Sequence, residues 1–168
     1  LDEEVWDLVP WTEEFVDIEG PLRPLPTWRT RVKMLWDDDY FYFAAELVEP
    51  HVWGTLTERD AVIFHDNDFE IFIDPDGDTH NYFEFEINPL GTMWDLFLPR
   101  PYRDGTRAIN SWNMTDFQSA VHVDGELNNP EGEDRGWTVE VALPMSTLRR
   151  GAPGNRAPQP GDQWRVNF

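Results

Sequence analysis

The sequence predicts an all-β fold, an antiparallel β-sandwich of the jelly-roll or immunoglobulin-like kind with at most one short helix. Short runs of residues alternate between apolar and polar side chains, as half-buried strands do. The 14 Pro and 11 Gly lie mostly between these runs, where they mark turns. Because 168 residues is the size of one domain, residues 1–168 are expected to form a single β-sandwich around one core.

Residues 30–47 predict a β-hairpin. In the first half Val32 and Met34 alternate with other residues, and in residues 40–47 aromatic side chains are frequent. The turn-forming run Asp37-Asp38-Asp39 separates the two halves. We therefore expect two adjacent antiparallel strands here.

Four further segments predict strands by the same alternation, namely residues 69–73, 82–88, 137–143 and 164–168. The acidic loop DPDGDTHN joins the first two of them. Residues 144–150, PMSTLRR, look helical, with Pro144 suited to a first turn and Gly151 to a stop.

The polar side chains of these strands share one parity of the alternation. If the strands are neighbours in one sheet, these side chains form a single polar face. Such a face is either a solvated surface or a platform that binds a ligand. Its members are Glu70, Glu84, Glu86, Asn88, Glu140, Arg165 and Asn167.

The net charge of −20, from 33 acidic and 13 basic residues, narrows the classes of partner. Nucleic acid is not expected, since its recognition depends on clustered Lys and Arg, and anionic membranes are disfavoured for the same reason. Neutral sugars, metal cations and basic proteins remain as classes of partner that this charge permits. No apolar run approaches the roughly 20 residues of a membrane span, and the chain has no Cys for disulfides or thiolate sites.

The loop acids Asp74, Asp76 and Asp78 are candidate ligands of a calcium ion. They are spaced by two residues, Gly77 permits a tight bend, and carboxylate oxygens are the ligands that calcium selects. An EF-hand is rejected, because that loop needs flanking helices and a downstream bidentate Glu. The alternative is a solvated hairpin loop that uses Asp for its turn propensity.

Catalysis has no positive support in the sequence. Glu84 and Glu86 share a strand face at the spacing of a glycosidase acid pair, but acids on an exposed strand face are usually solvated or bonded to a ligand. The chain lacks G-x-S-x-G, H-E-x-x-H and P-loop patterns, and its four His do not have metal-site spacing. No enzymatic activity is expected.

Nine Trp are more than the core of a sandwich of this size requires. Trp137 and Trp164 lie on apolar strand faces and are expected in the core. Trp53, Trp94 and Trp112 lie in loop-like or ambiguous segments, where their rings either stack on the C–H faces of a sugar or cover the ends of the sandwich. Trp94 and Trp112 are therefore candidate carbohydrate-binding residues.

Five runs of the sequence together resemble carbohydrate-binding module family 9 and its DOMON-related neighbours. They are VKMLWDDDYFYFAAELVEP, DNDFEIFIDPDG, FEFEIN, GWTVEVALP and GDQWRVNF. The resemblance implies a β-sandwich that binds the reducing ends of plant polysaccharide chains and carries structural calcium.

By position, the resemblance implies sugar-binding roles for Phe64, in place of one Trp of an aromatic clamp, and for Glu70, Asn88 and Asn167. Glu86 stands where the family has an Arg, so the charge beside the sugar is reversed. The second Trp of the clamp belongs to a C-terminal segment that this chain does not contain. The resemblance thus implies a domain that lacks its C-terminal segment.

These observations predict a secreted, extracellular or periplasmic, non-catalytic module that binds a neutral poly- or oligosaccharide and holds structural calcium. The predicted carbohydrate-binding residues are Phe64, Glu70, Glu86, Asn88, Trp94, Trp112 and Asn167. Two alternatives from other classes stay open. One is a structural or assembly module of an extracellular fibre or complex with protein partners, and the other is a haem-binding DOMON-like domain that uses Met and His.

Overall fold

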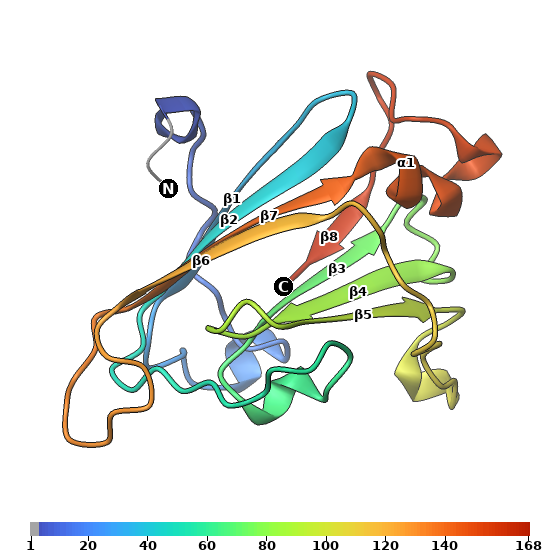
Figure 1. The fold of residues 1–168 in the computed structure, drawn as a ribbon. Helices are drawn as coiled ribbons and strands as arrows, with labels where there is room; N and C mark the ends of the chain where they lie inside the picture. Colours follow the sequence, from blue (N-terminus) through green and yellow to red (C-terminus); the bar gives the residue numbers. More distant parts are fainter. Residues whose placement is uncertain (1–3) are drawn as a thin grey trace.

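The computed structural model describes residues 4–168, which form two four-stranded antiparallel sheets (Figure 1). One sheet has the strand order β1-β2-β7-β6 and the other has the order β5-β4-β3-β8. The predicted all-β sandwich is confirmed. The strands are β1 (Thr30–Trp36), β2 (Tyr40–Leu47), β3 (Phe69–Asp74), β4 (Tyr82–Ile87), β5 (Met93–Leu98), β6 (Gln118–Asp124), β7 (Gly136–Pro144) and β8 (Arg165–Asn167).

The helical segments between these strands are short. Within the described residues the only α-helix, α1 (Met145–Leu148), lies inside the predicted helical stretch and is followed by the 3-10 turn η5 (Arg149–Gly151). No helix in this part of the chain is long and apolar enough to cross a membrane. The other 3-10 helices are η1 (Glu4–Leu8), η2 (Gly20–Leu22), η3 (Ile63–His65), η4 (Tyr102–Asp104) and η6 (Pro153–Asn155).

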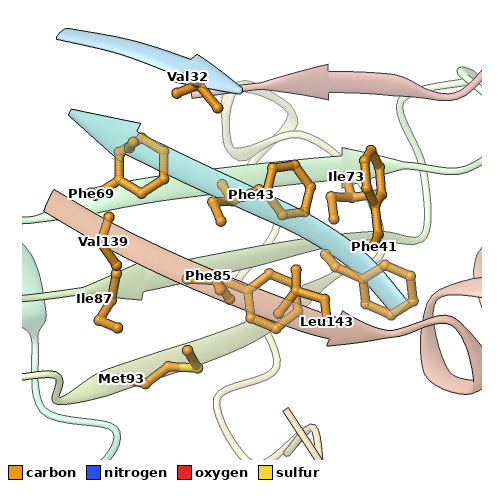
Figure 2. Close-up of a cluster of buried hydrophobic side chains, with 14 of the residues drawn as sticks. Val32, Phe41, Phe43, Phe69, Ile73, Phe85, Ile87, Met93, Val139 and Leu143 are labelled. Carbon is orange, nitrogen blue, oxygen red and sulfur yellow. The ribbon is translucent and has the colours of Figure 1, made fainter. Parts of the chain in front are cut away.

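The core lies between the two sheets (Figure 2). Phe43 of β2 and Leu143 of β7 lie on one side of it and Phe85 of β4 on the other, and all three are almost completely buried. Burying a side chain of this size stabilises the fold by about 1.5–3 kcal/mol. Trp137 is buried in this core, and Trp164 is partly buried against it, in agreement with the sequence.

β1 and β2 form the predicted hairpin, and Asp37 stabilises its turn. Its Oδ1 accepts hydrogen bonds from the backbone N–H groups of Tyr40 (2.7 Å) and Asp39 (2.8 Å). These bonds, above all the one from Tyr40, hold the pKa of the Asp37 carboxyl below its usual range.

β5 and β6 are the strands that alternation in the sequence does not reveal. On β5 both faces are apolar, because Leu96 and Leu98 are buried on the side away from the core. β6 is an exposed edge strand, on which Val121 and Val123 are the residues packed against the core. Both strands are stabilised by pairing, β5 with β4 and β6 with β7.

Candidate functional site

The side chains of the β5-β4-β3-β8 sheet that point away from the core form what we call the outer face. The register places Glu70 opposite Glu86, which in turn lies opposite Trp94. Asn167 lies opposite Phe72. The strands that carry these polar side chains are therefore neighbours in one sheet, which is the condition under which their shared parity predicts a single face.

Glu140 does not belong to this face, although its parity matches. It lies on β7 in the other sheet, where its Oε2 accepts a 3.1 Å hydrogen bond from the indole N–H of Trp6. The alternation of side chains shows which way a residue points within its strand, but it does not show to which sheet the strand belongs.

Phe64 and Trp94 form an aromatic pair on the outer face. Phe64 lies in η3, whose first residue, Ile63, is fully buried and anchors the turn. The centroids of the two rings are 6.1 Å apart and their planes are inclined by 38°. The indole N–H of Trp94 donates a hydrogen bond to Oδ1 of Asn110. Because Phe64 is 53% exposed, the pair offers ring surface to a ligand.

Asp68, Glu70 and Glu86 form a carboxyl cluster beside this pair. Each of them offers an oxygen that lies within 4.8 Å of the other two. Glu86 is 2% exposed, and its Oε2 accepts a 3.2 Å hydrogen bond from the backbone N–H of Phe64. Oδ2 of Asp68 is buried and has no hydrogen-bond partner among residues 4–168. The cluster therefore contains a buried carboxyl oxygen whose hydrogen-bonding capacity no described residue uses.

Burial changes the protonation of the cluster. Burial, together with the negative charges of Glu70 and Asp68, raises the pKa of Glu86 to about 8. Burial likewise raises the pKa of Asp68 to about 7, and it raises the pKa of Glu70. Near neutral pH the cluster therefore retains protons, so its members can both donate hydrogen bonds to ligand hydroxyl groups and accept them.

A groove of about 330 Å³ also lies along the outer face, where Phe72, Asn167 and Tyr102 of η4 line it. The hydroxyl group of Tyr102 donates a 2.7 Å hydrogen bond to Oε2 of Glu84. Burial nevertheless raises the pKa of Glu84 to about 7. The predicted site residue Asn167 therefore lines a groove whose lining also includes the aromatic side chains of Phe72 and Tyr102.

Asn88 is completely buried and holds the loop that carries Phe64. Its Nδ2 donates hydrogen bonds to the backbone carbonyl of Leu56 (2.8 Å) and to Asp66 (2.9 Å). Its Oδ1 accepts hydrogen bonds from the backbone N–H groups of Leu90 (3.1 Å) and Thr92 (2.9 Å). The side-chain amide is thus fully used inside the protein, and its geometry supports a positioning role.

Trp112, another predicted site residue, lies on the core side of the same sheet. Its ring centroid is 5.1 Å from that of Phe83 and 6.3 Å from that of Phe97. Both Phe side chains point away from the outer face, because they share the parity of the core residue Phe85. The structure therefore separates Trp112 from Trp94 by the thickness of the sheet.

The architecture agrees with a comparison against protein families. A family model described as "Carbohydrate family 9 binding domain-like" matches residues 1–158. The chain belongs to this family. No curated protein matches this family 9-like domain.

Solved structures similar to the family 9-like domain include two of a carbohydrate binding module family 9 (CBM9) from Caldicellulosiruptor kristjanssonii. One is in complex with cellotriose, at 15% identity and a TM-score of 0.61, and covers 98% of this chain and 66% of that one. The other is in complex with glucose, at 15% identity and a TM-score of 0.62, and covers 99% of this chain and 68% of that one. The domain thus spans about two thirds of the length of these relatives.

The acidic loop of the family 9-like domain brings Asp74, Asp76 and Asp78 together, with one oxygen of each within 4.8 Å of the others. Both oxygens of Asp74 accept backbone hydrogen bonds, from Gly77 (2.9 Å) and Thr79 (2.8 Å). The loop acids therefore stabilise the turn. They also fit a calcium ion, because all three offer hard oxygen ligands and a carboxylate oxygen that accepts one hydrogen bond keeps a free lone pair.

Sequence reasoning missed Tyr102 as a residue of the outer face, and the alternation was not extended from Glu70 to Asp68. Asp68 has the parity of Glu70 and lies two residues before it, so extending the alternation by one step would have found it. Tyr102 lies in a 3-10 turn, where no period of two indicates the face of the sheet that it covers.

Proposed function

We propose that this family 9-like domain binds a neutral glycan through the outer face and does not cleave it. The observation that supports this most directly is the aromatic pair Phe64 and Trp94 beside the carboxyl groups of Glu70 and Glu86. Aromatic rings stack on the apolar C–H faces of sugars, and carboxyl groups form hydrogen bonds with sugar hydroxyls. Both kinds of group are present on one side of one sheet.

The groove beside Tyr102 and Asn167 offers a second set of contacts along the same face. A glycan lying along the sheet would place one sugar unit against the aromatic pair and another in the groove. The solved relatives contain cellotriose and glucose. Glucose oligomers of the cellotriose type are therefore the first ligands to test.

The placement of the acids supports binding over hydrolysis. Glu70, Glu84 and Glu86 all lie on one face of one sheet. A glycosidase needs an acid on one side of the scissile bond and a base or nucleophile on the other. Side chains that approach a sugar from one side only can bind it but cannot flank it.

We also propose that the domain acts outside the cytoplasm, in the extracellular space or the periplasm, where a polysaccharide ligand would be met. In the same proposal Asp74, Asp76 and Asp78 hold a calcium ion that stabilises the loop between β3 and β4. The negative charge of the three loop carboxylates supports a divalent cation there.

Affinity electrophoresis tests the glycan proposal. Gels that contain soluble β-glucan, xylan or mannan should retard the protein, and Phe64→Ala and Glu70→Ala should each restore most of its mobility. Trp28→Ala and Glu131→Ala are matched controls, since both residues are exposed and lie outside the outer face. Unchanged mobility of the unmodified protein in every glycan would contradict the proposal.

A specific observation also supports the assembly alternative. Several apolar side chains between residues 16 and 25 are largely exposed, among them Ile18 (91%), Leu22 (84%) and Leu25 (77%). Exposed apolar patches often mark protein contacts. We propose self-association through this segment as the second candidate function. Light scattering that shows only a monomer at high concentration, with and without calcium, would exclude it.

A further inference from the structure

A second cavity lies between the free edges of the two sheets. β1 is the outermost strand of one sheet and β8 that of the other, and the cavity beside them has a volume of about 830 Å³. It is at the end of the sandwich that holds the β1–β2 turn, α1 and the segment before β8, whereas η3 lies toward the other end (Figure 1). Its lining includes Met34, Trp36, Phe41, Met145, Gln163 and Trp164.

Trp36 is exposed although its strand position points it between the sheets. It shares the parity of Val32 and Met34, which pack in the core. Val32 is completely buried, whereas Trp36 is 67% exposed, because the cavity separates the sheets at this point. The ring centroid of Phe41 lies 6.4 Å from that of Trp36 and 6.3 Å from that of Trp164. The cavity thus has an aromatic wall in which Trp36 is largely exposed, Trp164 is partly exposed and Phe41 is buried.

Several polar groups of the cavity lack partners in the described part of the chain, although Asp162 in the same lining is paired with Arg156. The guanidinium group of Arg165, the side-chain amide of Gln163 and the indole N–H groups of Trp36 and Trp164 form no hydrogen bond with residues 4–168. The amide oxygen of Gln163 is the free acceptor, because Asp76, which also lines the cavity, belongs to the proposed calcium cluster. Donors and acceptors are therefore both free at the edge of an aromatic cavity.

We infer that this cavity is a second saccharide-binding site, which takes one neutral pyranose unit independently of the outer face. A pyranose has apolar C–H faces for the rings of Trp36 and Trp164, and its hydroxyl groups satisfy donors and acceptors alike. A neutral ligand is favoured because the net charge of −20 repels anions. The cavity volume lies within the range of about 300–1,000 Å³ that is usual for small-molecule sites.

A haem group is the alternative ligand for this cavity, since Met34 and Met145 line it and a Met sulfur can coordinate haem iron. No His is among the lining residues, and the two propionates of a haem would add negative charge to a chain of net charge −20. The combination of aromatic rings with free donors and acceptors favours a sugar, and haem binding serves as a contrary outcome in the test.

The indole N–H signals of the 168-residue chain, observed by ¹⁵N NMR, test this inference. The probes are glucose, xylose, mannose, galactose and cellotriose. In the double variant Phe64→Ala, Trp94→Ala, at least one probe should still shift the signals of Trp36 and Trp164 in a saturable way. Trp36→Ala and Arg165→Ala, which change exposed residues, should each weaken this binding at least tenfold. Trp28→Ala should leave it unchanged.

The outcomes separate this site from the outer face. If every probe leaves the signals of Trp36 and Trp164 unmoved, the cavity site is wrong, whether or not the outer face binds. The cavity site is also wrong if the variant Trp36→Ala binds all probes with the same affinity as the unmodified protein. If the protein binds haemin stoichiometrically, with a Soret band that Trp36→Ala abolishes, the ligand of the cavity is haem and the saccharide inference is wrong. If the double variant binds every probe as tightly as the unmodified protein does, the outer-face proposal is contradicted and the cavity site stands.

Discussion

The backbone N–H of Phe64 donates a 3.2 Å hydrogen bond to Oε2 of Glu86. This bond links the exposed ring of the aromatic pair to the most deeply buried carboxyl group of the outer face. Because the ring is carried by a short 3-10 turn, its position over the sheet depends on contacts of this kind. The aromatic and acidic parts of the proposed glycan site are therefore connected by a direct hydrogen bond, so a change in one is expected to shift the other.

The carboxyl groups of the outer face should make the protein less stable as pH rises. The folded-state pKa values of Glu86 (about 8), Asp68 (about 7) and Glu84 (about 7) lie above the value of about 4 that such groups have in an unfolded chain. Between these limits the folded state binds more protons, so the free energy of unfolding falls with rising pH. We expect a melting temperature several degrees lower at pH 8.5 than at pH 5.5.

Glu86→Gln should reduce this loss, because a buried amide cannot ionise. Glu131→Gln makes the same change of charge at an exposed position and is the control for the general repulsion among the acids of this chain. Equal pH profiles for the two variants, measured by thermal denaturation, would show that Glu86 is not the source of the effect.

Asn88→Ala should destabilise the protein by about 3 kcal/mol and also weaken glycan binding. It removes four hydrogen bonds and leaves the backbone N–H groups of Leu90 and Thr92 without their acceptor. Binding suffers because Asn88 holds Asp66, two residues after Phe64. Asn129→Ala, which removes exposed hydrogen bonds, should change neither property. Urea denaturation and calorimetric titration measure the two effects.

Removal of calcium should lower the melting temperature. A ligand that binds only the folded state stabilises it by RT ln(1 + [L]/Kd), which is about 2.7 kcal/mol at a hundredfold excess over Kd. We expect excess chelator to remove this stabilisation, and Asp76→Asn to make the protein insensitive to chelator. Asp39→Asn, in the loop of the other hairpin, should keep the sensitivity. A melting temperature that chelator does not change would count against the site.

Asp95→Ala should be among the most damaging substitutions on β5. Asp95 is completely buried on the core side, where it accepts hydrogen bonds from the side chain of Arg59 and the backbone N–H of Met114. The substitution leaves the buried N–H of Met114 without its acceptor, which costs about 1–3 kcal/mol, whereas the partly exposed Arg59 keeps Asp60 nearby. Asp124→Ala breaks the exposed pair with Arg135 and should have no measurable effect in the same denaturation experiment.

The sequence by itself determined the class of fold and the direction of many side chains. Alternation in β1, β3, β4 and β7 is a local property of extended backbone, so it could be recognised without knowing any neighbour. The same reasoning put Glu70 and Glu86 on one polar face and Trp137 in the core. It failed for β5, where both faces are apolar, and for β6, where few residues are buried.

Only the tertiary structure decided which of these side chains lie together and how deeply they are buried. Strand pairing separated Glu140 from the face that Glu70 and Glu86 share, and it put Trp94 and Trp112 on opposite sides of one sheet. Glu86 is almost completely buried in the folded protein, and this burial raises its pKa although the hydrogen bond from the N–H of Phe64 acts in the opposite direction. The cavity beside Trp36 likewise exists only because two sheet edges diverge there, a property of distant segments that no local pattern contains.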